Sequence, residues 1–140
     1  MERWIVYAFI SMFFAGFTSV IAKQGLAGIS AELGLTVRTV FVFFFILLFA
    51  LWALTTSELN SLRRENYFWL GLSGVTTAIS WVFYYKALKL GSVATVALID
   101  KGSVVVAVFL AWLLLREVIT PRMVMGAVLI IGGLLLVAKK

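Results

Sequence analysis

The chain has 140 residues, of which 64% are hydrophobic and 13% are charged, and it contains neither Cys nor His. A soluble domain of this length could not bury so much apolar surface, so the composition predicts an integral membrane protein. The absence of Cys and His excludes disulfides, thiol or imidazole catalysis and the usual transition-metal sites. The formal net charge of +6 does not indicate nucleic-acid binding, because the basic residues lie between apolar runs and form no patch.

Five apolar segments approach the length of about 20 residues that a helix needs to cross the hydrocarbon core of a bilayer. They occupy residues 4–22, 36–54, 67–85, 92–115 and 121–138. The runs are too long and too uniformly apolar for the alternating strands of a membrane barrel. The sequence therefore predicts an all-α integral membrane protein with five transmembrane helices in one module, residues 1–140.

The first segment ends before Lys23 and Gln24, and small and polar residues recur along it at helical spacing. We expect Tyr7 and Ser11, which belong to this stripe, to line a solute cavity, although the stripe also suits helix packing. The second segment is almost entirely Phe, Leu, Ile and Val, which predicts packing and lipid contact. Arg38 lies near its start and is expected to anchor the helix at the membrane interface.

One face of the third segment is polar, and this segment ends before Lys86 and Lys89. Hydroxyl and aromatic side chains share that face at helical spacing, namely Ser73, Thr76, Thr77, Ser80 and Tyr84, with Trp81 at its border. A cavity lined by hydroxyls and aromatic rings suits a small amphipathic or aromatic solute. The alternative is close helix packing, which uses the same small and hydroxyl side chains.

The fourth segment contains the adjacent acid and base Asp100 and Lys101, followed by Ser103. Helix neighbours point about 100° apart, so we expect Asp100 and Lys101 to have other partners, such as Arg38 or a base from a second copy for Asp100. Asp100 is the candidate for proton coupling and Lys101 for capture of a charged solute. The alternative is a structural ion pair, with Lys101 reaching the membrane surface.

The fifth segment begins with Thr120 as a helix N-cap and Pro121 in the first helical position. Its glycines Gly126, Gly132 and Gly133 are candidates for dimerisation, because glycines let a second helix approach closely. Packing within one molecule is the alternative. Lys139 and Lys140 are expected to close this helix.

The basic residues divide almost evenly between the two sides of a five-helix protein. One side would carry five of them, Arg3, Arg63, Arg64, Arg116 and Arg122. The other side would also carry five, Lys23, Lys86, Lys89, Lys139 and Lys140, or six if Arg38 reaches the surface. Because Lys and Arg in short loops set orientation, this balance predicts dual insertion with antiparallel pairing. A fixed topology decided by small effects is the alternative.

In these features the chain resembles the EamA-like branch of the drug/metabolite transporter superfamily, in its single-module, five-helix form. The most specific similarity lies in residues 84–91, 99–101, 103–105, 113–120 and 126–133, and residues 22–24 and Arg38 look like early family motifs. Most relatives carry two inverted modules, so the resemblance implies a dimer of single modules. It also implies similarity of the last helix to the dimerising helix of small multidrug resistance proteins. Many relatives have proline where this chain has Leu98, so the resemblance does not itself predict a kink there.

Together these features predict an alternating-access transporter for a small metabolite or amphipathic solute, working as an antiparallel homodimer in a prokaryotic plasma membrane. The alternative is a membrane scaffold, or a subunit that completes a partner module without transporting by itself. We expect no enzyme activity, since no nucleophile–base spacing is present, and no cofactor. The expected partners are a small-molecule solute, the lipid bilayer and a second copy of the chain.

Overall fold

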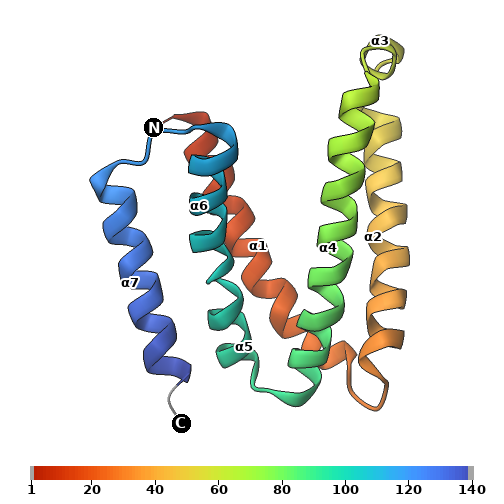
Figure 1. Ribbon diagram of the computed structural model, residues 1–140. Helices are drawn as coiled ribbons and strands as arrows, with labels where there is room; N and C mark the ends of the chain where they lie inside the picture. Colours follow the sequence, from red (N-terminus) through yellow and green to blue (C-terminus); the bar gives the residue numbers. More distant parts are fainter. Residues whose placement is uncertain (1, 139–140) are drawn as a thin grey trace. The chain divides into compact units, whose positions relative to one another are not determined.

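Within residues 2–138, the part of the chain that this computed structural model describes, the polypeptide forms seven α-helices (Figure 1). They are α1 (Arg3–Gly25), α2 (Ala31–Ala53), α3 (Thr56–Asn60), α4 (Arg64–Leu90), α5 (Val93–Asp100), α6 (Ser103–Leu115) and α7 (Pro121–Ala138). The predicted all-α class is therefore confirmed. Lys139 and Lys140, expected to close the last helix, lie outside the described residues.

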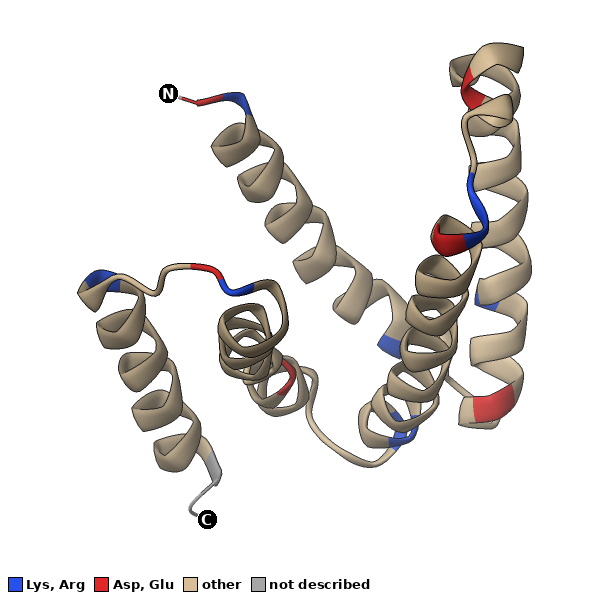
Figure 2. Cartoon of the chain, turned by 45° about the horizontal axis from the view of Figure 1, so that its top comes forward, with Lys and Arg blue, Asp and Glu red and all other residues tan. Residues whose placement is uncertain are grey.

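The helices are apolar on their outer surfaces. Among the described residues, α1, α2 and the combined stretch Val93–Leu115 are long and apolar enough to cross a membrane, and α7 supplies a shorter apolar helix. Helix α4 has 27 residues, which is long enough to cross a bilayer at about 1.5 Å per residue, but its polar face lowers its mean hydropathy. Charged residues lie mainly at helix ends and in loops (Figure 2).

The chain divides into two compact units, which are described separately. The first consists of residues 2–20 and 91–138, and the second is Ile21–Leu90, so α1 contributes to both. In the second unit α2 packs along α4 (Figure 1). Its core is small and lies near one end of these helices, where Leu26, Ala31, Tyr85 and Leu88 are buried. Gly34 permits this packing, because a Cβ there would collide with the side chain of Leu26.

Two helices of the second unit extend beyond the predicted apolar spans. Helix α2 begins at Ala31, five residues before the predicted start, because Ser30 is its N-cap and accepts a hydrogen bond from the Leu33 N–H at 3.2 Å. Helix α4 continues to Leu90, five residues beyond the predicted end. Its lysines do not end the helix, since both find polar partners, as described below.

The short helix α3, which the sequence analysis does not predict, is held by an acidic cap. The carboxylate of Glu58 accepts hydrogen bonds from the Thr55 backbone N–H at 2.8 Å and from the Thr55 hydroxyl at 2.7 Å. These two bonds, the backbone bond first, hold the pKa of Glu58 below its ordinary value.

A lowered pKa means that this cap stabilises α3 at neutral pH and is lost as the pH falls through the pKa of the folded state. We expect the Thr55 amide proton to titrate with a midpoint below that of an ordinary glutamate, measured by NMR in detergent. Thr55→Ala should raise the midpoint, because it removes the hydroxyl bond. A Glu58→Gln variant in which the same titration persists would contradict this assignment.

In the first unit α7 packs against both α5 and α6 (Figure 1). The Met123 N–H donates to the Thr120 hydroxyl at 3.3 Å, so the predicted cap of α7 is confirmed. The predicted fourth segment, residues 92–115, is not one continuous helix, because a turn at Lys101 and Gly102 separates α5 from α6. There the Gly102 and Val104 N–H groups donate three residues back, to Ile99 and Lys101 at 2.9 and 3.1 Å. Such a tight turn within a helix often marks a hinge, and here it forms without a proline.

Candidate functional site

Two lysines join the ends of α1 and α4 in the second unit. The Lys23 ammonium donates to the carbonyl of Leu88 and lies 3.4 Å from that of Lys89. In return, the Lys89 ammonium donates to the carbonyl of Leu26 at 2.9 Å. Each lysine therefore places a positive charge at the C-terminal carbonyls of the other helix. This is favourable because helix C-termini are partly negative. We call these contacts the reciprocal lysine pair.

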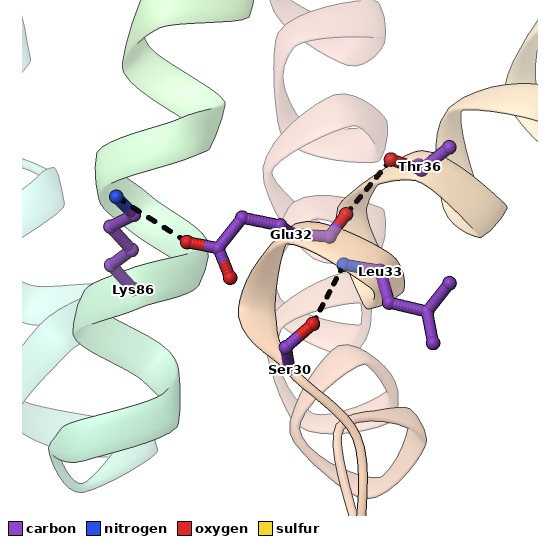
Figure 3. A network of polar contacts seen from close by, with 5 residues as sticks. All are labelled: Ser30, Glu32, Leu33, Thr36 and Lys86. Carbon is purple, nitrogen blue, oxygen red and sulfur yellow. Dashed lines mark hydrogen bonds and ion pairs between the residues drawn. The ribbon is translucent and has the colours of Figure 1, made fainter.

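A second polar contact links α4 to the start of α2 (Figure 3). The Lys86 ammonium lies 3.4 Å from a carboxylate oxygen of Glu32, and both side chains are more than half exposed. The Glu32 carbonyl also accepts a hydrogen bond from the Thr36 hydroxyl at 2.9 Å. A small hollow of about 150 Å³ lies beside this ion pair, between α2 and α4.

Arg38 is held against aromatic rings of α4. Its guanidinium carbon lies 4.2 Å from the centre of the Trp81 ring and 5.8 Å from that of Tyr85. The side chain is partly buried, and its Nη1 atom is buried with no hydrogen-bond partner among residues 2–138. Arg38 lies seven residues into α2, about 10 Å from the start of the helix, and its role as an interface anchor stays a prediction.

The polar face of α4 keeps most of its side chains accessible. Thr76, Thr77 and Ser80 are exposed, whereas Trp81 and Tyr84 are partly buried. The hydroxyls of Thr76 and Thr77 both donate to the Ser73 carbonyl, at 2.9 and 2.8 Å. These hydroxyl protons are thus occupied within the helix, and the oxygens face outward as hydrogen-bond acceptors.

Asp100 and Lys101 contact each other, contrary to the expectation that each has another partner. The Lys101 ammonium lies 3.9 Å from a carboxylate oxygen of Asp100, which is long for an ion pair. The turn that ends α5 brings the two side chains together, because Lys101 no longer continues the regular helix. The Asp100 side chain is 39% exposed. Ser103 begins α6 directly after this turn.

The residues predicted to line the cavity belong to both units, so the cavity that they would form together stays a prediction. The first unit contains Tyr7 and Ser11, which are exposed on α1, and also Asp100, Lys101 and Ser103 at the turn between α5 and α6. The α4 residues belong to the second unit. The first unit has a hollow of about 360 Å³ between α6 and α7, lined mainly by apolar residues such as Val105, Phe109 and Val128. None of the predicted site residues lines it.

The glycines of α7 face open space. A Cβ built on Gly126, Gly132 or Gly133 would meet nothing within 4 Å in the described part of the chain. Packing within this unit therefore does not explain these glycines, and their dimerisation role stays a prediction.

The polar contacts of the second unit are not predicted from the sequence. Lys23, Lys86 and Lys89 are expected there only as surface charges that end helices, and Glu32 is given no role. One signal for these contacts was present in the sequence. Lys86 and Lys89 lie near the end of α4, and lysines in the last turn of a helix often bind helix carbonyls. The Arg38–Trp81 contact needs the register of α2 against α4, which one sequence does not supply.

The amino-acid sequence of this chain is similar to those of known membrane transporters. Residues 2–139 match the EamA-like transporter family. The protein named "Uncharacterized transporter in cobO 3'region" from Sinorhizobium sp. is 33% identical over 137 residues, which cover 98% of this chain and 97% of that protein. No solved structure matches the chain.

Proposed function

The chain belongs to the EamA-like transporter family, which contains transporters and not enzymes, and from this premise we propose that it moves a small amphipathic solute by alternating access. The chain is a multi-pass membrane protein. We further propose that it acts as an antiparallel homodimer in a prokaryotic plasma membrane. The cavity would then lie between copies, lined by α1, α4 and the α5–α6 turn.

The observation that carries the transport proposal is the accessible polar face of α4. Side chains such as Thr76, Thr77 and Ser80 are exposed on a helix of a membrane protein, where polar groups are costly unless they face a cavity. Aromatic residues Trp81 and Tyr84 border the hydroxyls, so the face can hold both parts of an amphipathic molecule. The turn at Lys101 and Gly102 supports alternating access, because it gives one helix a point at which its two halves can move.

Two observations support antiparallel pairing. The basic residues predicted on the two membrane sides are nearly balanced, which gives the insertion machinery little direction. The α7 glycines leave a face on which a second copy could pack closely. Inverted pairing of identical chains would reproduce the inverted repeats that many transporters carry within one chain.

Labelling of introduced cysteines tests the pairing, because the chain has no natural cysteine. Asn60→Cys, at the end of α3, and Ala27→Cys, in the turn before α2, place single exposed thiols beyond opposite ends of α2. For dual insertion, we expect a membrane-impermeant maleimide applied to intact cells to label about half of each variant, because each loop would face outward in half of the copies. Full labelling of one variant and none of the other would establish a single topology and exclude antiparallel pairing.

A further inference from the structure

We propose that Arg38 binds the acidic group of the transported solute, so that the solute is an amphipathic carboxylate with an apolar or aromatic body. This inference rests on the proposed transport function and adds the chemical class of the substrate. It is carried by the position of the guanidinium against Trp81 and Tyr85 and by its unsatisfied Nη1.

The guanidinium of Arg38 lies against two aromatic rings, and its buried Nη1 has no hydrogen-bond partner in the described chain. A separation of 4.2 Å between the guanidinium carbon and the Trp81 ring centre is typical of a cation–π contact, which uses the face of the planar group. The N–H groups lie in that plane and point outward from its edge. A carboxylate that reaches this edge, once the atoms that cover Nη1 move aside, would accept two parallel hydrogen bonds.

The unsatisfied Nη1 indicates that a polar partner is missing from the described chain. A buried donor without a partner is costly, and more so when the group is charged. Arg38 lies two turns inside an apolar helix, with Val37 and Val40 nearby in sequence. The carboxylate of Glu32, one and a half turns earlier, is already paired with Lys86 at 3.4 Å. An external anion would satisfy Nη1 and neutralise the charge in a setting of low dielectric constant.

The surroundings of Arg38 suit the apolar body of the solute. Tyr85 is buried, Trp81 is partly buried, and both rings lie beside the guanidinium. Aromatic rings next to a charged anchor favour ligands that join a carboxylate to an apolar or aromatic group.

Equilibrium binding of three matched probes tests the site in the purified full-length protein. Phenylacetate, phenylacetamide and phenethylammonium share one ring but differ in charge, and calorimetry in detergent gives each affinity. We expect phenylacetate to bind at least about tenfold more tightly than the other two, because only it forms charge-assisted bonds with Arg38. Arg38→Gln should remove this preference, whereas the matched control Arg122→Gln, at an exposed arginine of α7, should keep it.

Arg38→Lys provides a second test if Arg38→Gln does not fold. It keeps the charge but loses the two-pronged geometry, so the preference for phenylacetate should fall several-fold without vanishing. Equal affinities for the three probes in the natural protein, or an unchanged preference in either Arg38 variant, would overturn the inference.

Exchange of the same probes across liposome membranes separates this inference from the proposed function. If the protein exchanges phenethylammonium or phenylacetamide but not phenylacetate, transport stands and the carboxylate site is wrong. If phenylacetate binds in an Arg38-dependent way and no probe is exchanged, the site stands and the transport proposal fails. Exchange of phenylacetate that Arg38→Gln abolishes supports both.

Discussion

Asp100→Asn should abolish solute accumulation driven by a pH gradient while leaving passive exchange of the solute intact. The reason is that asparagine keeps the size and polarity of aspartate but cannot take up a proton. The measurement is uptake into proteoliposomes of whichever aromatic probe the natural protein exchanges, with and without an imposed gradient. One coupled proton supports about tenfold accumulation per pH unit, since one unit corresponds to about 1.4 kcal/mol.

Two features of Asp100 support this prediction. It ends α5 beside the turn that separates α5 from α6, where a change in its charge would act on the proposed hinge. Its ion pair with Lys101 is long, at 3.9 Å, and its side chain is 39% exposed.

Two variants complete the test of Asp100. Asp100→Glu should retain gradient-driven uptake, because it keeps a titratable carboxylate at the hinge. Glu117→Gln should behave like the natural protein, since Glu117 is an exposed acid outside the helices of the same unit. Equal accumulation by Asp100→Asn and the natural protein at every external pH would show that protons are not coupled at this position.

The sequence predicts the helices well because a bilayer demands long apolar segments, whatever their neighbours. Gly91 and Ser92 separate α4 from α5 as expected, and Thr120 caps α7. The errors occur where a charged residue belongs to a helix. Glu32 lies in the first turn of α2, where an acid is favourable, and Lys86 and Lys89 remain in α4 because Glu32 and the Leu26 carbonyl pair with them.

The site is harder to predict than the fold because its contacts join residues far apart in the sequence. Periodicity identifies the polar face of α4, since that face depends on one helix alone. Arg38 and Trp81 are 43 residues apart, and they meet only because α2 and α4 pack in one particular register. Asp100 and Lys101 are adjacent, yet ideal helix geometry would separate their side chains. The turn at Gly102 changes that geometry, and it was not predicted because Leu98 stands where many relatives have proline.

Lys23→Met should strongly destabilise the second unit, and Lys89→Met should do so to a similar extent. Each variant removes a charged donor from the carbonyls at the end of another helix. Leu26 and Leu88, whose carbonyls accept these bonds, are only 2% and 0% exposed, so solvent cannot replace the lost donor. A hydrogen bond from a charged group contributes about 1.5–3 kcal/mol, and we expect each variant to lower the free energy of unfolding by roughly that amount. Unfolding by SDS in mixed micelles, followed by circular dichroism, measures it.

Lys86→Met is the matched control for the reciprocal lysine pair. It lies on the same helix and loses an ion pair, but Lys86 and Glu32 are 51% and 64% exposed, so the loss should stay below about 1 kcal/mol. The double variant Lys23→Met/Lys89→Met should lose less than the sum of the single changes, because both lysines hold the same two helix ends together. Equal losses for Lys23→Met and Lys86→Met, or strict additivity in the double variant, would show that the two lysines act as separate surface charges.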